Sequence, residues 1–574
     1  MIFKYRKNIP LRSLIRLCSY FFILAGIVYS NFLYSQSVNV PLNKDYYHIL
    51  DRMAIKSGKM SSYYNSAMKP YRREMVAEFT KELNADSLEF SHIDKFNKEY
   101  IKDDNWSFYD STVGNSRKPF LKALYRKKAD FYSLKTKDFE LHVNPVFHFS
   151  VGSDSESDVM PYVNTRGVEA SGLIAGKIGY YTYLATTQAA YPLYVRKYID
   201  QNGVVPYEGY WKAYNTDGVD YFTPRGYISF NIIKQLNVQF GNDKLFLGEG
   251  IRSLGLSDFT NNYLFLKFDL KVWKLYYRLV FAQHYADVYS RPGTGSLGGP
   301  YPRKYLAHHH LTFDIGKNLR LGFFEHVIMG DSANNSFDPN YLNPAIFYRG
   351  LEHQSGSTDN VIVGFDLTWN FLRRFSLYSQ FILDEFVLSE ITSGDGWWAN
   401  KYGLQLGLKY MDAFWIKNLD LTLEYNVSRP YTYAHDNIYT NLANYRMPLA
   451  HPFGANFREF IAVARYQPFK RFSFIGKLII SGYGEDDIDT NWGKDVMKSY
   501  NTVEQQYGNE IGQGYKTNFG YFDFTTSYQF KHNVFFDLQF LFRNVESELD
   551  AFDDNTFFTS LHFRMNIPRK MFDF

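Results

Sequence analysis

The chain has 574 residues, including 49 Tyr and 52 Phe, and its mean hydropathy is −0.34. This abundance of aromatic residues favours strands, because aromatic side chains pack well on a pleated surface. Lys and Arg number 63 against 59 Asp and Glu, so the basic excess typical of nucleic-acid-binding proteins is missing and no nucleic acid is expected as a partner.

Residues 1–35 are typical of a secretory signal peptide. Five Lys and Arg come first, the apolar run 17–29 follows, and small residues near Ser35 predict cleavage just before Gln36. A membrane anchor is the alternative, but the apolar run is too short for one. Without residues 1–35 the chain has no Cys and one more acidic than basic residue, so disulfides are not expected.

Residues 36–138 are rich in Lys, Glu and Asp and show helical spacing. We expect helices over 45–56, 70–83 and 87–102, with Pro70 in the first turn of the second helix. A flexible linker is the alternative, but the apolar stripes favour a small helical domain.

From residue 139 onward the period of apolar residues changes to two. The alternation is clearest over 401–411 and 418–428, which have the length of strands that cross a bilayer at a tilt. Neighbouring residues of a strand point to opposite faces, so two side chains should face lipid and two the lumen of a barrel. The expected lipid-facing residues are Leu406 and Leu423, and the expected lumen residues are Gln405 and Glu424.

The alternation continues for more than 400 residues, with charged residues deep inside the segments. A soluble sandwich alternates too, but this extent predicts a transmembrane β-barrel with a polar lumen over 139–574. No later segment offers about 20 consecutive apolar residues for a membrane helix. About eighteen antiparallel strands are expected, at 139–151, 166–176, 178–190, 226–233, 236–243, 262–270, 273–285, 304–315, 318–329, 359–371, 374–388, 401–411, 418–428, 457–468, 471–482, 520–531, 533–545 and 557–567.

The connections alternate between short turns, such as Val272 and Leu372-Arg373, and long loops. This arrangement is typical of barrels in the bacterial outer membrane, whose short turns face the periplasm. The helical domain precedes the first strand, so we expect it in the periplasm. The chain ends in Phe574, and a terminal aromatic on an alternating strand resembles the assembly signal of outer-membrane barrels. The barrel assembly machinery is therefore an expected partner besides outer-membrane lipid.

The chain contains no catalytic or cofactor-binding motif, so we predict a protein that is not an enzyme and has no cofactor. His308 and His310 share one strand face, for which lumen lining is favoured over metal binding. Residues 487–491 begin like a calcium loop but lack its Gly and Glu. Trp397 and Trp398 lie in a long loop, where stacking on sugars and placement in an interfacial belt are equally supported.

Four stretches carry a resemblance to a known family: 41–58, PLNKDYYHILDRMAIKSG; 240–258, FGNDKLFLGEGIRSLGLSD; 343–352, NPAIFYRGLE; and 451–460, HPFGANFREF. The chain resembles Wzi-like capsule-assembly outer-membrane proteins, and more narrowly their gliding-motility relative RemB. The resemblance implies an eighteen-stranded barrel with a periplasmic helical bundle and a role in holding capsular polysaccharide. It also implies functional positions within the matching stretches.

Nine residues of these stretches, together with Trp397 and Trp398 of the long loop, are candidates for polysaccharide binding or for bracing the lumen, with bracing favoured for most of the polar residues in the stretches. They are Asp243, Arg252, Tyr348, Arg349, Glu352, Trp397, Trp398, His451, Asn456, Arg458 and Glu459.

The leading hypothesis is a surface barrel that binds or organises capsular or exopolysaccharide, with a link to gliding motility suggested by the narrower resemblance. The alternative is a porin-like channel, since eighteen strands enclose a lumen wide enough for water. Whether the long loops fold inside the barrel distinguishes the two.

Overall fold

The computed structural model describes residues 37–83, 90–286, 302–330, 337–344, 347–350, 359–385 and 387–574. The expected signal peptide lies outside the described residues. Within them, no helix has the length and apolar character needed to cross a membrane.

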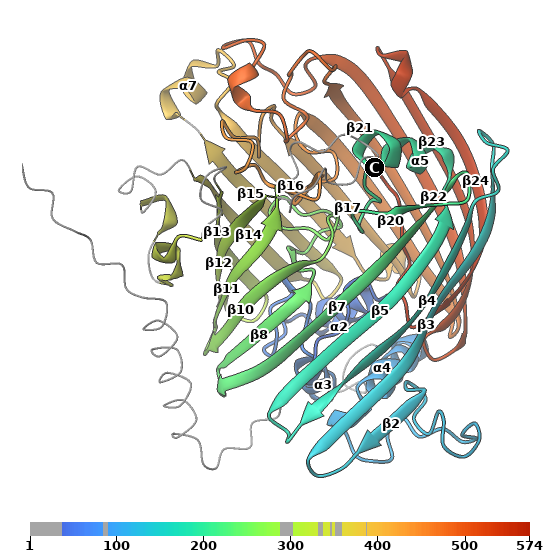
Figure 1. The fold of residues 1–574 in the computed structure, drawn as a ribbon. Helices are drawn as coiled ribbons and strands as arrows, with labels where there is room; N and C mark the ends of the chain where they lie inside the picture. The colour runs from blue at the N-terminus through green and yellow to red at the C-terminus, as the bar shows by residue number, and fades with distance from the viewer. Residues whose placement is uncertain are drawn as a thin grey trace, which may run out of the picture.

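Eighteen antiparallel strands form a closed barrel, because the last strand, β24, pairs with the first wall strand, β3 (Figure 1). The wall consists of β3 (Phe139–Asp154), β4 (Tyr162–Ile174), β5 (Ile178–Ala190), β7 (Gly218–Ile233), β8 (Leu236–Asp243), β10 (Tyr263–Val272), β11 (Leu275–Tyr285), β12 (Arg303–Ile315), β13 (Leu319–Met329), β14 (Asn360–Phe371), β15 (Phe375–Glu385), β16 (Lys401–Tyr410), β17 (Leu419–Ser428), β20 (Phe457–Phe469), β21 (Phe472–Glu485), β22 (Tyr515–Lys531), β23 (Val534–Ser547) and β24 (Asp554–Met565). Each expected strand has one counterpart in this wall, so the predicted fold class is confirmed.

Some boundaries differ from the expectation. Strand β7 begins at Gly218, eight residues early, and continues through Pro224 because it stays paired with β5 from Val219 to Ser229. Strand β10 includes Val272, which was expected in the turn. Two short strand pairs lie off the wall: β1 (Met68–Lys69) with β9 (Phe246–Leu247), and β18 (Ala443–Asn444) with β19 (Met447–Pro448). Two further short strands pair with wall strands: β2 (Tyr132–Lys135) with β3, and β6 (Lys212–Tyr214) with β7.

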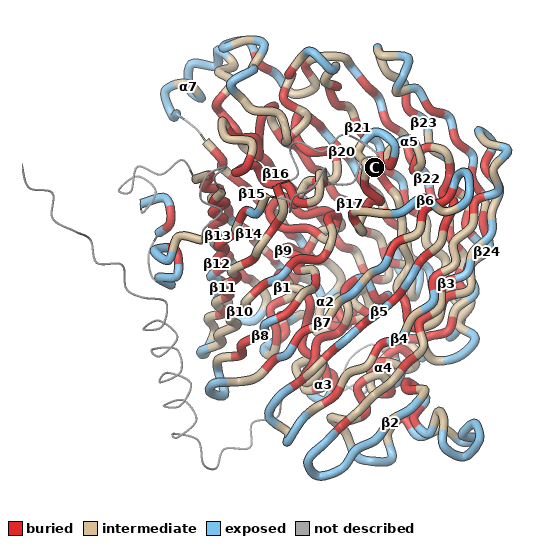
Figure 2. Tube along the Cα trace, in the orientation of Figure 1, coloured by how far each residue is buried: buried red, intermediate tan, exposed pale blue. Residues whose placement is uncertain are grey.

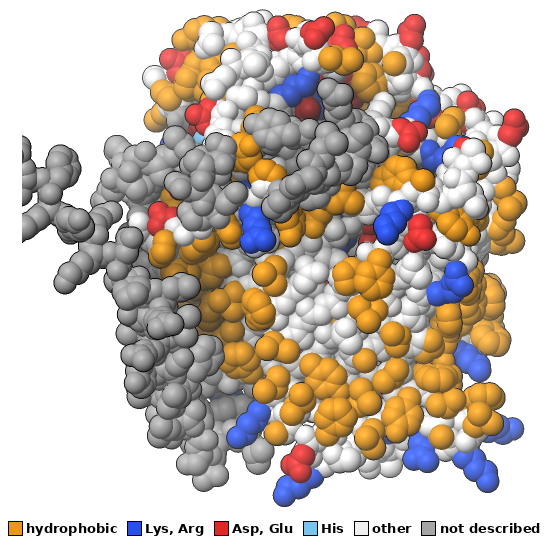
Figure 3. All heavy atoms as spheres, viewed as in Figure 1, with side chains coloured by type: hydrophobic (Ala, Val, Ile, Leu, Met, Phe, Trp, Pro, Cys, Tyr) orange, Lys and Arg blue, Asp and Glu red, His pale blue; other side chains and the backbone are white. Residues whose placement is uncertain are grey.

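The wall is apolar outside and polar inside, the reverse of a soluble protein. Leu406 and Leu423 point outward with 46% and 41% of their surface exposed, whereas Gln405 and Glu424 are buried inside. All four predicted orientations are confirmed. Figure 3 shows apolar side chains gathered over the visible wall, with charged side chains along its lower rim and above. An outward apolar band is the property that lets a barrel contact lipid.

One end of the barrel carries the short turns. The turn between β14 and β15 has three residues, 372–374, and two of them, Leu372 and Arg373, have positive φ, 52° and 55°. Several large side chains stand exposed around this rim, which suits a position at a membrane interface. They are Trp273, Leu372, Phe414, Trp415 and Phe469.

The N-terminal helices lie at the turn end, with α2 inside the wall (Figures 1 and 2). They are α2 (Tyr46–Ser57), α3 (Arg73–Glu82) and α4 (His92–Asp104), and they share a buried apolar core. Pro70 precedes α3 instead of occupying its first turn, because Arg72 at the N-cap position is still extended and the helix begins at Arg73. We refer to residues 37–83 and 90–105 as the plug.

Several of the long loops at the other end pack into the barrel mouth. Two buried apolar clusters combine residues of the wall with the loops that follow β5, β8 and β17. Helices α5 (Leu193–Asn202) and α7 (Leu388–Ser393) belong to this end. Strand β15 ends at Glu385, three residues earlier than expected, because residue 388 already belongs to α7.

The C-terminal tail corrects one expectation. Strand β24 ends at Met565, and the remaining residues turn into the lumen. Phe574 is buried there against Tyr198 and Phe259 at 4.7 and 5.7 Å between ring centroids. The terminal aromatic is therefore a loop-packing residue and does not lie on the last strand.

Candidate functional site: the braced lumen

The segment between β8 and β10, residues 244–262, crosses the lumen and joins the plug. Its strand β9 pairs antiparallel with β1 of the plug, and Gly248 N donates to Ala67 O at 2.8 Å. Gly248 has φ 121°, and a Cβ there would lie 2.7 Å from the Gln380 amide nitrogen. The glycine therefore permits both the turn and the close approach to β15. We call residues 244–262 the crossing loop.

A buried carboxylate on β17 holds the middle of the crossing loop. Glu424 accepts backbone N–H bonds from Ile251 at 2.6 Å and from Arg252 at 3.0 Å. It also accepts from the Tyr378 hydroxyl at 2.8 Å and from Asn426 at 2.8 Å. Charge-assisted bonds of this kind are stronger than neutral ones, so Glu424 fixes the backbone of the loop to the wall.

Arg252 extends this attachment to the next strand and to the C-terminal tail. Its guanidinium forms ion pairs with Glu459 of β20 and with Asp573, both at 3.1 Å. His451 reaches the same Glu459 at 2.8 Å, and Lys477 pairs with Asp573. The structure thus brings Arg252, His451 and Glu459 together, in an arrangement suited to bracing.

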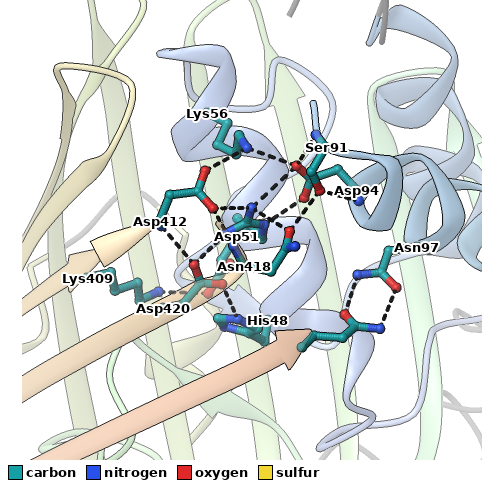
Figure 4. A network of polar contacts seen from close by, with 12 residues as sticks. His48, Asp51, Lys56, Ser91, Asp94, Asn97, Lys409, Asp412, Asn418 and Asp420 are labelled. Atoms are coloured by element: carbon teal, nitrogen blue, oxygen red, sulfur yellow. Dashed lines mark hydrogen bonds and ion pairs between the residues drawn. The ribbon is translucent and has the colours of Figure 1, made fainter. Parts of the chain in front are cut away.

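A second network fixes the plug to the turn end of the wall (Figure 4). Arg52 of α2 pairs with Asp94 of α4 at 2.7 Å, with Asp412 at 2.7 Å and with Asp420 of β17. Lys56 pairs with Asp94 and Asp412, each at 2.8 Å. Because these partners come from the plug and from the β16–β17 hairpin, the network joins the helices to the wall.

The charges of this second network shift one another's protonation. Burial alone would raise the pKa of Asp412, but the guanidinium of Arg52 lowers it from 3.8 to about 2. Asp94 is affected in the same way, since Arg52 and Lys56 outweigh its burial and lower its pKa. Both carboxylates are therefore charged at neutral pH.

The described residues that follow β13, 337–344 and 347–350, lie against the outside of the wall. His309 of β12 and Glu325 of β13 face outward and form a pair at 2.7 Å. Tyr348 covers them: its ring stacks on His309 at 4.4 Å and its N–H donates to Glu325 at 3.0 Å. The Arg349 N–H donates to the same carboxylate at 3.3 Å. Tyr348 and Arg349 are thus far from the lumen network.

Trp397 and Trp398 occur at the loop end, half-buried in an aromatic cluster. Trp398 lies 4.9 Å from Tyr500 and 6.0 Å from Tyr431, measured between ring centroids. The backbone carbonyl of Trp397 accepts from Arg429 at 3.3 Å. Both indoles therefore keep part of their surface at the loop end while neighbouring loops hold them in place.

The remaining candidates are dispersed. Asp243 ends β8 and faces Arg225 at 3.7 Å, while Asn456 donates to Gly484 O and Gln513 O in the loop end. Arg458 is exposed on the outward face of β20, away from its neighbour Glu459. Glu352 lies outside the described residues.

Sequence reasoning missed several members of both networks. Alternation placed Glu424 in the lumen, but nothing local showed that a loop would bind it. Asp573 was missed because it lies beyond the last expected strand, 557–567, and nothing in the sequence showed that the tail would enter the lumen. Arg52 was missed because a charged residue on a helix usually faces water.

A chamber of about 340 Å³ lies in the lumen between the plug, the crossing loop and the tail. Arg252 and Asp573 form part of its lining, as do His48 of α2 and Arg465 of β20. Among the described residues, no group of three or more His, Cys, Asp or Glu has a geometry suited to holding a metal ion.

No protein-family model matches the chain, and no curated protein matches its sequence. The fold is similar to that of Wzi, a carbohydrate-binding β-barrel of the outer membrane involved in group 1 capsule assembly in Escherichia coli. The TM-score is 0.55 at 10% identity, over 93% of this chain and 100% of Wzi. OprD of Pseudomonas aeruginosa also matches, with a TM-score of 0.40 at 11% identity over 74% of this chain and 94% of OprD.

Proposed function

We propose that the protein is a non-enzymatic barrel of a bacterial outer membrane that binds or organises an exported polysaccharide at the cell surface. The outward apolar band, the short turns at one end and the long loops at the other support the membrane placement. By the same rule the turn end and the plug lie on the periplasmic side, and the loop end faces outward.

The attachment of the crossing loop is the observation that carries the proposal. A porin needs a continuous water-filled path, whereas here Arg252, Glu424 and Glu459 hold a loop across the described lumen. Buried charges paired in this way keep a segment in place, because removing one partner leaves the other uncompensated. A barrel with a fixed loop across its lumen is better suited to binding a ligand at its outer surface than to transporting solutes.

The loop end offers the chemistry for sugars. Trp397 and Trp398 present aromatic surface among polar loops, and rings fixed by neighbouring loops lose little conformational entropy on binding. The fold likeness to Wzi, a carbohydrate-binding barrel, agrees with this assignment.

Binding of purified protein to the polysaccharide of its own host tests the proposal. Replacing both Trp397 and Trp398 by Ala should weaken binding at least tenfold. The matched control is Trp415→Ala, an exposed tryptophan at the turn end, which should bind normally. In cells, deletion of the gene should reduce cell-associated polysaccharide. Unchanged surface polysaccharide together with no binding by the purified protein would refute the proposal.

A channel for small solutes is the second candidate, supported by the chamber of about 340 Å³ in the lumen. Such a channel would have to open by moving the crossing loop. A link to gliding motility rests on the sequence resemblance alone. It predicts that colonies of a deletion strain fail to spread, and normal spreading would remove the link.

A further inference from the structure

The chamber in the lumen has an excess of positive charge. Ten Lys and Arg but only six Asp and Glu line it. Five of the six carboxylates already have a cationic partner, and the sixth, Asp258, accepts a hydrogen bond from Asn43 and forms no ion pair among the described residues. Four positive charges are therefore not balanced within the lining.

Three cations of the chamber form no ion pair with any described residue: Lys69, Lys244 and Arg465. Lys69 donates to Gly248 O at 3.0 Å. Lys244 donates to Tyr207 O at 2.7 Å and to Asp258 O at 3.1 Å. Backbone carbonyls therefore position both ammonium groups, and nearby carboxylates such as Glu208 and Glu249 act on them only from beyond ion-pair distance.

Arg465 is the least satisfied of the three. It lies on β20 opposite Asp420 of β17, but Arg52 and His48 already occupy that carboxylate. Among the described residues Arg465 forms neither a side-chain hydrogen bond nor an ion pair, so its five N–H donors have no protein acceptor. A guanidinium in this state is a fork suited to the oxygens of a carboxylate or a phosphate.

The surroundings make these charges costly without a counter-ion. Burial lowers the pKa of Lys244 to about 8 and lowers that of Lys69 as well. An anion in the chamber would compensate this effect, since a nearby negative charge favours the charged form of an amine. The volume of about 340 Å³ is within the usual size of small-molecule sites.

We propose that the lumen chamber is a binding site for a small anion with several acceptor oxygens, a phosphate group or the carboxylate of an acidic sugar, held by Arg465, Lys244 and Lys69. The site is distinct from the loop-end surface, and it does not depend on the polysaccharide role.

Calorimetric titration of the full-length protein in detergent tests the inference with two probes, inorganic phosphate and glucuronate. Glucose and sodium chloride at matched ionic strength are the reference titrations. At least one of the two anions should bind saturably with a stoichiometry near one. The anion that binds more tightly shows whether the site prefers a phosphate group or a sugar carboxylate. Arg465→Gln should weaken that binding at least tenfold, and because this side chain has no partner the variant should fold.

The matched control is Arg166→Gln, which removes an exposed arginine from β4. It should bind the anion as the unmodified protein does. If neither anion binds saturably, or if Arg465→Gln binds as tightly as the control, the inference is wrong. The loop-end tryptophan variants should bind the anion normally, which separates this test from that of the polysaccharide role.

Discussion

Arg252 and Glu459, 207 residues apart in the chain, lie 3.1 Å from each other in the lumen, buried to 5% and 0% side-chain exposure. This pair joins the crossing loop to β20. It explains how a loop rich in glycine is held across a wide barrel.

Removing the arginine should destabilise the protein strongly. Arg252→Ala leaves Glu459 and Asp573 buried without their shared cationic partner. We expect this to lower the free energy of unfolding by about 3 kcal/mol. Urea unfolding from lipid vesicles measures this loss. Arg458→Ala, which alters the outward neighbour of Glu459, should stay within about 0.5 kcal/mol. Equal losses in the two variants would show that the brace contributes nothing.

The attachment of the plug should depend on pH. The pKa of Asp412 is lowered to about 2 in the folded protein, from an ordinary value of 3.8. A lowered carboxylate pKa contributes stability that is complete above pH 3.8 and is lost as the pH falls through 2. Hydrogen exchange of α2 should therefore be constant from neutral pH to about 4, after allowance for the intrinsic rate, and should quicken below that. Asp412→Asn should remove part of this pH dependence, and an unchanged profile would contradict the assignment.

The two faces of β17 should tolerate change differently. Leu423→Arg places a charge on the outward apolar band, at an expected cost of about 2–4 kcal/mol. In single-cysteine variants, a lipid-soluble reagent should modify position 423. Position 424 should resist water-soluble reagents, because Glu424 is only 1% exposed beneath the crossing loop. Rapid labelling at 424 by such a reagent would mean that the loop does not cover it.

Tyr348 should matter for stability although it lies outside the barrel. Tyr348→Ala uncovers Glu325 on the outward face and removes a buried ring, which we expect to cost about 3 kcal/mol. The neighbouring Phe347 is 52% exposed, so Phe347→Ala should cost much less. Thermal unfolding of both variants in detergent checks this difference, and similar midpoints would argue against the covering role.

The sequence predicted the wall well because alternation is a local property. Leu406 and Gln405 differ in orientation since neighbouring residues of a strand must do so, and no tertiary information is needed. The turn at Leu372 and Arg373 was found for the same reason. Strand ends were less accurate where the partner strand decides the length, as for β7.

The networks were harder to predict because their partners are far apart in the chain. Local spacing does not show that Arg252 meets Glu459, or that Arg52 of a helix meets Asp420 of a strand. The tail was misplaced because Phe574 fits both an alternating strand and a buried loop core. In each case a long-range contact decides the position of the residue.

Single-channel recording in planar bilayers tests the central claim, a lumen closed by the crossing loop, most directly. The account predicts that the unmodified protein stays silent. It also predicts that Arg252→Ala, which releases the loop from Glu459 and Asp573, produces intermittent openings. A large, steady conductance from the unmodified protein would contradict the account and establish the barrel as a channel.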